Sequence, residues 1–265
     1  MQLDMQKEYL FTALASIDSG DIIFVGRPDD NAVLSASIST ALSPSFFPVG
    51  SELIASGSSI GTVVQNGYIP GHDGLHSVDG MWVKMSGAMK DRDTAAVRVV
   101  KNSMSLAWIT LSDKGARNLR VDGSGPLIEK LVRETYALSY ARGFIIPDEE
   151  RQLRQLLTDL ALAQQFDCIL TTGGTGVSPR DVTPEATLGV IEKRLKGFEQ
   201  AMMAVSLDKT PHAVISRAIA GTLGNSLIVN MPGSTKAVSE TLTAILPAVG
   251  HTLAKLQGDP ADCGN

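Results

Sequence analysis

The chain has 265 residues, of which 43% are hydrophobic, so it is long enough to bury the core of one large domain or of two smaller ones. Its formal net charge of −5 provides no general electrostatic attraction to nucleic acid or to an acidic membrane. No apolar run approaches the roughly 20 residues that span a bilayer, and the start of the chain lacks the apolar core of a signal peptide. We therefore expect neither a nucleic acid nor a membrane as partner.

The two cysteines are not expected to pair. Cys168 falls in a predicted core strand and Cys263 in a predicted tail, so we expect no disulfide between them. Unpaired cysteines are typical of reducing compartments, and we predict that the protein is cytoplasmic.

Residues 1–100 are rich in Gly, Ser and Pro and contain short apolar runs between turn signals. The runs at 21–26, 61–64 and 81–84 are typical of strands, whereas 2–17 is the one stretch compatible with a helix. Several short strands with frequent turns predict a small β-rich domain of antiparallel or barrel-like form over residues 1–100. Charges cluster at 91–103, where we expect the linker to the next domain.

One constellation in this region contains residue types that bind metals. His72, Asp73, His76 and Asp79 lie close together in a glycine-rich segment. Because the segment is not helical, the spacing places the four side chains on no common face. A metal site and an exposed polar loop therefore both remain open.

Residues 101–265 alternate regularly between strands and helices. Apolar strands are predicted at 106–111, 141–146, 168–172 and 226–230, and helices at 126–136, 149–165, from 184, and at 235–255. Strands that are apolar throughout predict an α/β fold in which helices cover both faces of a mostly parallel sheet. The stretch 196–222 is less regular and is expected to cover a site or to form a subunit contact.

The stretch from 167 to 187 is predicted to be a strand, a loop and a helix. Gly173, Gly174 and Gly176 allow a sharp turn in which successive backbone N–H groups can bind an anion. Thr183 is predicted to cap the following helix, and Pro184 to be its first residue. Right-handed crossovers bring the carboxyl ends of parallel strands to one edge. We therefore expect four polar loops to converge there, at 112–117, 147–148, 173–181 and 232–236.

Two aspartates at this edge, Asp148 and Asp181, are the candidate acidic groups. Paired carboxylates suit Mg²⁺, which shares its oxygen ligands with substrate phosphates. The two glycine-containing turns would donate backbone N–H groups to phosphates, and Lys236 would add a positive charge. The same residues also fit a tight turn, a helix-entry aspartate and a solvated lysine. Taken alone, they leave both interpretations open.

Four motifs, matched in order and spacing, resemble those of the MogA/MoaB family of molybdenum-cofactor biosynthesis proteins. They are Thr171–Thr187 (TTGGTGVSPRDVTPEAT), Ser112–Lys114, Ile146–Asp148 and Asn230–Gly233. The resemblance extends over residues 104–257 and does not include residues 1–100. It implies that residues 101–265 form a MogA-like molybdopterin-binding domain.

The resemblance also implies an activity. Members of the MogA branch adenylylate molybdopterin with ATP in the presence of Mg²⁺ and release pyrophosphate, and the family's catalytic and metal-binding aspartates correspond to Asp148 and Asp181. Its ligand-contacting positions correspond to Ser112, Asp113, Thr172, Gly173, Gly174, Thr175, Gly176, Ser178, Pro232, Gly233, Ser234 and Lys236. It further implies a homotrimer, or a hexamer as in the MoaB branch, and a molybdenum-insertion enzyme as partner. An alternative is a non-catalytic module that binds molybdopterin or nucleotide while residues 1–100 dock a partner.

Overall fold

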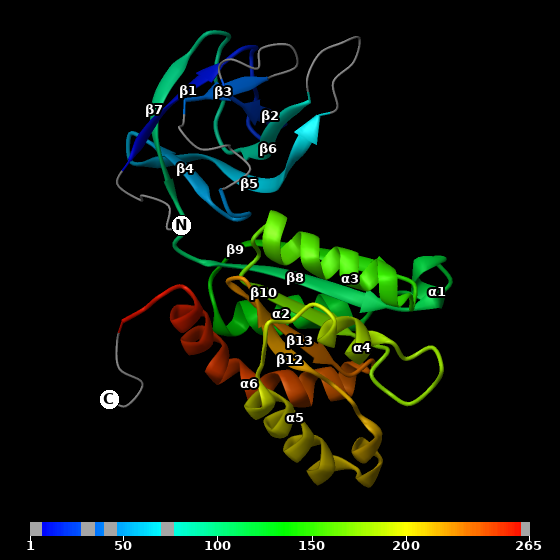
Figure 1. Ribbon diagram of the computed structural model, residues 1–265. Coiled ribbons are helices and arrows are strands. Elements are labelled where there is room, and N and C mark those ends of the chain that lie inside the picture. Colours follow the sequence, from blue (N-terminus) through cyan, green and yellow to red (C-terminus); the bar gives the residue numbers. More distant parts are fainter. Residues whose placement is uncertain (1–6, 28–34, 40–46, 70–76, 261–265) are drawn as a thin grey trace. The chain divides into compact units, whose positions relative to one another are not determined.

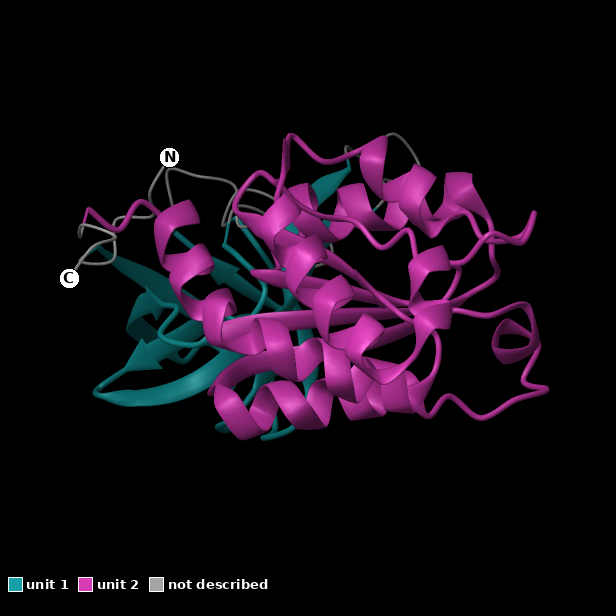
Figure 2. Ribbon diagram, turned by 90° about the horizontal axis from the view of Figure 1, so that it is seen from below, with its two compact units in different colours: residues 1–103 teal, residues 104–265 magenta. Residues whose placement is uncertain are grey.

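The computed structural model describes residues 7–27, 35–39, 47–69 and 77–260. The chain divides into two compact units, Met1–Ser103 and Met104–Asn265 (Figure 2). Each is described separately.

Unit 1 is a closed barrel in the strand order β1-β3-β2-β6-β5-β4-β7. Its strands are β1 (Glu8–Ala13), β2 (Ile22–Gly26), β3 (Ala36–Ile38), β4 (Glu52–Ala55), β5 (Ser58–Ile69), β6 (Val78–Met85) and β7 (Thr94–Val100). β1 pairs antiparallel with β7 and so closes the barrel. Glycine is required at Gly80, where a Cβ would lie 2.5 Å from the Phe24 ring and from the Val25 carbonyl oxygen.

Three expectations for unit 1 need correction or fall outside the description. The stretch 2–17, which was compatible with a helix, forms a strand over Glu8–Ala13, where burial alternates along β1 with the period of a strand. The linker predicted at 91–103 is wrong, since β7 occupies most of it. His72, Asp73 and His76 lie outside the described residues, and Asp79 is exposed on β6.

Unit 2 contains a six-stranded sheet in the order β11-β12-β13-β10-β8-β9. The strands are β8 (Met104–Leu111), β9 (Leu138–Ile146), β10 (Cys168–Thr172), β11 (Lys193–Arg194), β12 (Ala220–Leu223) and β13 (Ser226–Met231). The pairings from β9 through β8 and β10 to β13 are parallel. β12 pairs antiparallel with both β13 and β11. The sheet is therefore mixed, and the parallel arrangement that we predicted describes its four-strand core.

Helices cover both faces of this sheet (Figure 1). α2 (Ser124–Thr135), α5 (Lys196–Lys209) and α6 (Thr235–Leu256) form a hydrophobic core with one face of β8, β10 and β13. α3 (Glu150–Thr158) and α4 (Thr183–Leu188) pack together on the other face, where Leu153 and Leu157 are fully buried. α3 continues as a π-helical turn, η2 (Asp159–Ala163).

The stretch that was expected to be irregular, 196–222, contains α5, the 3₁₀ turn η3 (Pro211–Ile215) and most of β12. β12 is antiparallel to β13, and its first residue, Ala220, pairs with Val229 near the end of β13. The segment just before β12 therefore lies at the edge of the sheet where the polar loops lie. It thereby supplies side chains to that edge.

Candidate functional site

The candidate site lies where three neighbouring parallel strands end. Thr172, the last residue of β10, is in register with Thr110 of β8 and with Met231 of β13. The chain passes from β8 to β9 on one side and then to β10 on the other, so the strand order reverses between β8 and β10. Open α/β sheets bind ligands in the crevice at such a reversal.

Gly173 is the point at which these three strand ends meet. Its N–H donates to the Met231 carbonyl at 3.3 Å, and its φ of +99° is a conformation that favours glycine. A Cβ on Gly173 would lie 2.5 Å from the Leu111 carbonyl oxygen. A Cβ on Gly233 would in turn lie 3.3 Å from the Gly173 Cα. The loops that follow β8, β10 and β13 are therefore in contact at this residue.

Thr183 holds the glycine loop from the side of α4. Its hydroxyl donates to the Gly173 carbonyl at 2.8 Å, and its N–H donates to the Gly174 carbonyl at 3.1 Å. The predicted cap role of Thr183 is therefore wrong, because the cap position belongs to Val182 and the hydroxyl is used by the loop. Thr172 adds a bond on the other side, from its hydroxyl to the Pro232 carbonyl at 2.6 Å.

Arg217, which the sequence interpretation overlooked, binds the second half of the loop. Its Nε donates to the Gly176 carbonyl at 2.7 Å and its Nη2 to the Asp181 carbonyl at 2.8 Å. Its own N–H donates to the Thr175 carbonyl at 2.9 Å, and its remaining nitrogen pairs with Glu185. Burial alone would raise the pKa of Glu185, but the hydrogen bond and the charge of Arg217, together with a backbone hydrogen bond, leave that pKa below its usual value.

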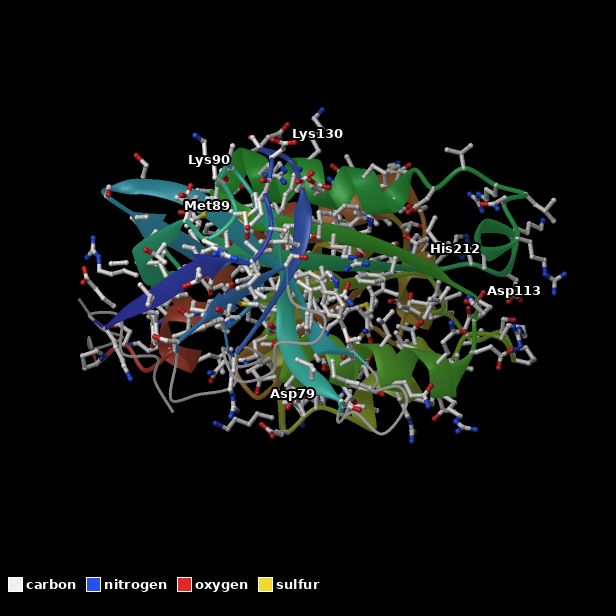
Figure 3. The ribbon with its side chains drawn as sticks, turned by 90° about the horizontal axis from the view of Figure 1, so that it is seen from above. Asp79, Met89, Lys90, Asp113, Lys130 and His212 are labelled. Atoms are coloured by element: carbon white, nitrogen blue, oxygen red, sulfur yellow. The ribbon has the colours of Figure 1, made fainter. Side chains whose placement is uncertain are left out.

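Asp113 and Asp148 bind each other's backbone. The N–H of Asp113 donates to Asp148 Oδ2 at 3.1 Å, and the N–H of Asp148 donates to Asp113 Oδ1 at 3.3 Å. Asp113 is the first residue of α1 (Asp113–Ala116), and Figure 3 labels it at the end of the unit where β8 finishes. Ser112 caps α1 by accepting a hydrogen bond from the Gly115 N–H at 3.0 Å. This exchange fixes the loops after β8 and β9 to one another.

Arg180 joins the glycine loop to these acidic residues. Its Nη2 lies 2.8 Å from Asp113 Oδ1, its Nε lies 3.2 Å from Asp113 Oδ2, and its Nη1 lies 3.0 Å from Glu149 Oε1. The hydrogen bond from Arg180 holds the pKa of Asp113 below its usual value. One guanidinium group therefore links two of the four loops that were expected to converge, 173–181 and 112–117, and also reaches Glu149, the residue directly after the 147–148 loop.

Asp148 and Asp181 lie along the glycine loop at successive points. A Cβ on Gly174 would be 3.3 Å from Asp148 Oδ1, and a Cβ on Gly176 would be 2.8 Å from Asp181 Oδ2. Burial raises the pKa of the half-buried Asp148, and the nearby charges of Asp113 and Asp181 add to the shift. The corner thus carries an excess of negative charge that a cation would offset.

The other predicted site residues are arranged around this corner. The Ser178 N–H donates to Asp181 Oδ2 at 2.8 Å, which shapes the loop between them. Thr175 is buried, with its carbonyl bonded to Arg217. Ser234 caps α6 by accepting from the Ala237 N–H at 3.2 Å, and Lys236 is exposed in the first turn of that helix.

Asp122 and Ser124 also belong to the site and were not among the predicted site residues. Asp122 Oδ1 accepts from the N–H groups of Ser124 and Gly125, each at 3.0 Å, and its Oδ2 accepts from the Thr110 hydroxyl at 2.7 Å. The Ser124 hydroxyl donates to the Gly233 carbonyl at 3.1 Å. The start of α2 is thereby tied to the loop after β13. An aspartate followed by small residues before a helix is the signal that could have revealed this.

A cavity of about 430 Å³ adjoins the glycine loop on the side of Arg217. Its walls come from α4, α5, the segment before β12 and the start of α6, and they include Leu188, Met202, Met203, Ile219, Pro232 and Thr241. This size is within the range of small-molecule sites. Arg217 and Glu185 line it as well, so the guanidinium group that binds the glycine loop also forms part of the cavity wall.

In the part of the chain that the structure describes, no group of three or more His, Cys, Asp or Glu side chains is arranged to hold a metal ion. Within the same residues, none of the helices is both long and apolar enough to span a bilayer.

Comparisons with known proteins match unit 2. The profile of the family "Probable molybdopterin binding domain" matches residues 107–251. Gephyrin of Dictyostelium discoideum is 38% identical over 161 residues, which cover 57% of this chain but 22% of gephyrin. A Helicobacter pylori protein named molybdopterin adenylyltransferase is 36% identical over 159 residues, which cover 59% of this chain and 90% of that protein.

Solved structures give the same result. The molybdopterin biosynthesis enzyme MoaB of Thermus thermophilus superposes with a TM-score of 0.55 at 38% identity, covering 60% of this chain and 99% of that chain. This similarity confirms the α/β fold. The barrel strands of unit 1 lie outside the family match.

Proposed function

The chain belongs to the family of molybdopterin-binding domains over residues 107–251, and from this premise we propose that it is a molybdopterin adenylyltransferase of molybdenum cofactor biosynthesis. The observation that carries the proposal is the placement of Asp148 and Asp181 along one glycine loop, at Gly174 and Gly176. The named activity of the Helicobacter pylori relative, 90% of which is covered, supports it.

The proposed reaction is the transfer of AMP from ATP to molybdopterin. A terminal phosphate oxygen of molybdopterin bonds to the α-phosphorus of ATP while the bond from that phosphorus to pyrophosphate breaks. The chain's contribution is to position the two substrates and to balance their charge, as is usual for phosphorus chemistry. Thr183 and Arg217 hold the glycine loop in one shape, so its backbone offers a rigid binding surface for phosphates. The adjoining cavity is large enough to receive the ring system of one substrate.

Asp148 and Asp181 would hold Mg²⁺ in this reaction. Mg²⁺ commonly uses one or two carboxylates and takes its other ligands from water and substrate phosphates, so a site formed by two aspartates fits it. The raised pKa of Asp148 reflects, after burial, the charges of Asp113 and Asp181, and a cation would relieve their repulsion. When bound, Mg²⁺ would neutralise negative charge on the phosphates.

The direct test is Asp181→Asn, assayed for AMP transfer to molybdopterin and for release of pyrophosphate. We expect transfer to fall by a factor of roughly 100 or more, the loss typical of a group that stabilises charge in the transition state. Asp159→Asn, in the π-helical turn η2, is the control for a change of charge elsewhere. Transfer at the wild-type rate by a folded Asp181→Asn variant would exclude a catalytic role. Binding of both substrates without pyrophosphate release in the wild type would favour a non-catalytic module.

We also propose a homotrimer, a cytoplasmic location and a molybdenum-insertion enzyme as partner. Light scattering tests the first, with an expected mass three times the chain's 28.0 kDa. Cell fractionation tests the second. A chain that begins at Met104 tests the role of unit 1, because the family match, residues 107–251, lies within unit 2. If that chain transferred AMP at the full rate, residues 1–103 would not be needed for the reaction, and docking of a partner would be their proposed role.

A further inference from the structure

We propose that Arg180 is an exchangeable polyphosphate-binding residue. In this structure its charge is balanced by Asp113 and Glu149, and it exchanges these two carboxylates for the phosphates of the nucleotide. This inference rests on the proposed function for the identity of the nucleotide, but not for the presence of the anion site itself.

The position of Arg180 brings it to the phosphates. It precedes Asp181 directly, and its own N–H donates to the Ser178 hydroxyl at 3.4 Å, so it belongs to the loop expected to hold phosphates. Its planar guanidinium group already binds one carboxylate through two nitrogens, at 2.8 and 3.2 Å. The same geometry fits two oxygens of a phosphate group.

The contacts of Arg180 are of a kind that can be exchanged. The side chains of Arg180, Asp113 and Glu149 are 52%, 39% and 57% exposed. Exposed ion pairs are screened by water and contribute little to stability. A polyphosphate carries several negative charges, compared with one on each carboxylate, and therefore competes effectively for the guanidinium group.

Release of Arg180 would not displace Asp113. The carboxylate of Asp113 also accepts the Asp148 N–H at 3.3 Å, and its own N–H is bonded to Asp148 Oδ2. Asp113 therefore stays beside Asp148 when the guanidinium group leaves. The exchange therefore moves the guanidinium group of Arg180 and leaves the loops after β8 and β9 joined to one another.

A purely structural role for Arg180 makes a different prediction. If Arg180 served only to fasten the glycine loop to α1 and α3, weakening its carboxylate partners would loosen the loop and weaken binding of an anion. If instead Glu149 competes with the anion for Arg180, its removal should strengthen binding, and this effect should require Arg180. The effect of removing the Glu149 carboxylate, measured with and without Arg180, therefore distinguishes a structural role of Arg180 from an anion-binding role.

The experiment is calorimetric titration of the full chain with inorganic tripolyphosphate, in the presence of a chelator. We expect Arg180→Ala to weaken binding by about tenfold, as for the loss of one charge-assisted contact, with Arg180→Lys intermediate because lysine keeps the charge but not the planar fork. Glu149→Gln should tighten binding by roughly threefold in the wild-type background and have no effect in the Arg180→Ala background.

The matched control is Glu150→Gln, which makes the same change of charge one residue away, on a side chain paired with Arg154. It should leave the affinity within about twofold of wild type. An unchanged affinity of Arg180→Ala, or no binding of tripolyphosphate by the wild type, would overturn the proposal. So would a tightening by Glu149→Gln that persists without Arg180, because that would be a general effect of charge. The titration contains no molybdopterin, so a failure of AMP transfer alone would overturn the proposed function and leave this inference standing.

Discussion

One arginine binds the glycine loop itself, and another links that loop to its neighbours. Arg217 donates to the carbonyl groups of Gly176 and Asp181, which are parts of the loop's own backbone. Arg180 extends from the loop and donates to the carboxylates of Asp113 and Glu149 on neighbouring segments. Hydrogen bonds to backbone carbonyl groups hold the loop in one shape, whereas an exposed side-chain carboxylate can exchange its partner for another ion.

The difference indicates a division of roles. Arg217 fixes the shape of the loop, and its side chain is 36% exposed compared with 52% for Arg180. The backbone N–H of Arg217 also donates to the Thr175 carbonyl, so both the backbone and the side chain of Arg217 hold the loop in place. We therefore expect the Arg217 side of the loop to control geometry, and the Arg180 side to control affinity for phosphates.

The largest effect is expected from Arg217→Ala. Two loop carbonyls would lose their donor, and the loop that carries Asp181 would shift. A displacement of about 1 Å can reduce turnover by roughly 100-fold, so we expect kcat for AMP transfer to fall by about that factor. The free energy of unfolding should fall by about 1–2 kcal/mol, because part-buried carbonyls lose hydrogen bonds. Steady-state kinetics and urea unfolding measure the two effects.

Arg194→Ala is the control for this variant. Arg194 lines the same cavity and pairs with Glu199, at 2.9 Å, but it serves the edge strand β11. An equal loss of kcat in both variants would show that the cavity wall matters in general, and would contradict a specific role of Arg217 in shaping the loop.

A smaller effect is expected from Thr183→Val, which also acts on the shape of the loop. The Thr183 side chain is fully buried, and its hydroxyl donates to the Gly173 carbonyl at 2.8 Å. Valine keeps the shape but leaves that carbonyl without this donor, at a cost of about 1–3 kcal/mol. We expect kcat to fall by roughly tenfold, less than for Arg217→Ala, because the Thr183 N–H still binds Gly174. Thr158→Val, which removes an exposed helical hydroxyl, should change neither quantity appreciably.

Arg180→Ala, unlike Arg217→Ala, should weaken the binding of ATP. We expect KM for ATP to rise by about tenfold with a much smaller change in kcat, the pattern of an interaction that is equally strong in the ground and transition states. The thermal midpoint should change little, since the ion pairs lost are exposed. If kcat fell as far as in Arg217→Ala while KM stayed constant, the two sides of the loop would not differ in role.

The sequence pattern predicted the alternation of strands and helices in unit 2 because the strands are continuously apolar and glycines follow β10 directly. It also placed the polar loops at one edge, since parallel strands end together. The beginning of the barrel was not predicted as a strand. The apolar content of residues 8–13 is compatible with both a helix and a strand. These residues form a strand because they pair with β7.

The parts of the site that were not predicted depend on contacts between distant residues. Arg217 is 36 residues from Asp181. It lies at this edge because β12, which follows it, is antiparallel to β13, and β12 has no signal of its own beyond a short apolar run. Thr183 is a residue type that commonly caps helices, yet its hydroxyl donates to the carbonyl of Gly173, ten residues earlier. The roles of Asp148 and Asp181 in catalysis remain predictions.

The smallest effect concerns the two carboxylates that bind each other's backbone. Burial, together with the charges of Asp113 and Asp181, raises the pKa of Asp148, so the folded chain holds its proton more readily than the unfolded chain. Between the ordinary and the raised pKa, stability therefore falls as pH rises, and at neutral pH the ionised Asp148 costs stability. Asp148→Asn should raise the free energy of unfolding slightly at about pH 7, and the gain should vanish at about pH 3, below the ordinary aspartate pKa.

Asp113 should behave in the opposite way, because the hydrogen bond from Arg180 lowers its pKa. Its contribution to stability is present above the ordinary aspartate pKa and is lost as pH falls through the lowered value, so Asp113→Asn should lower stability at about pH 7. Both effects should be small, since solvent screens these half-exposed groups. Urea unfolding of the two variants at both pH values measures the signs. If the two variants shifted stability in the same direction at neutral pH, Arg180 would not be what distinguishes the two carboxylates, and its assignment to the exchangeable side of the loop would lose this support.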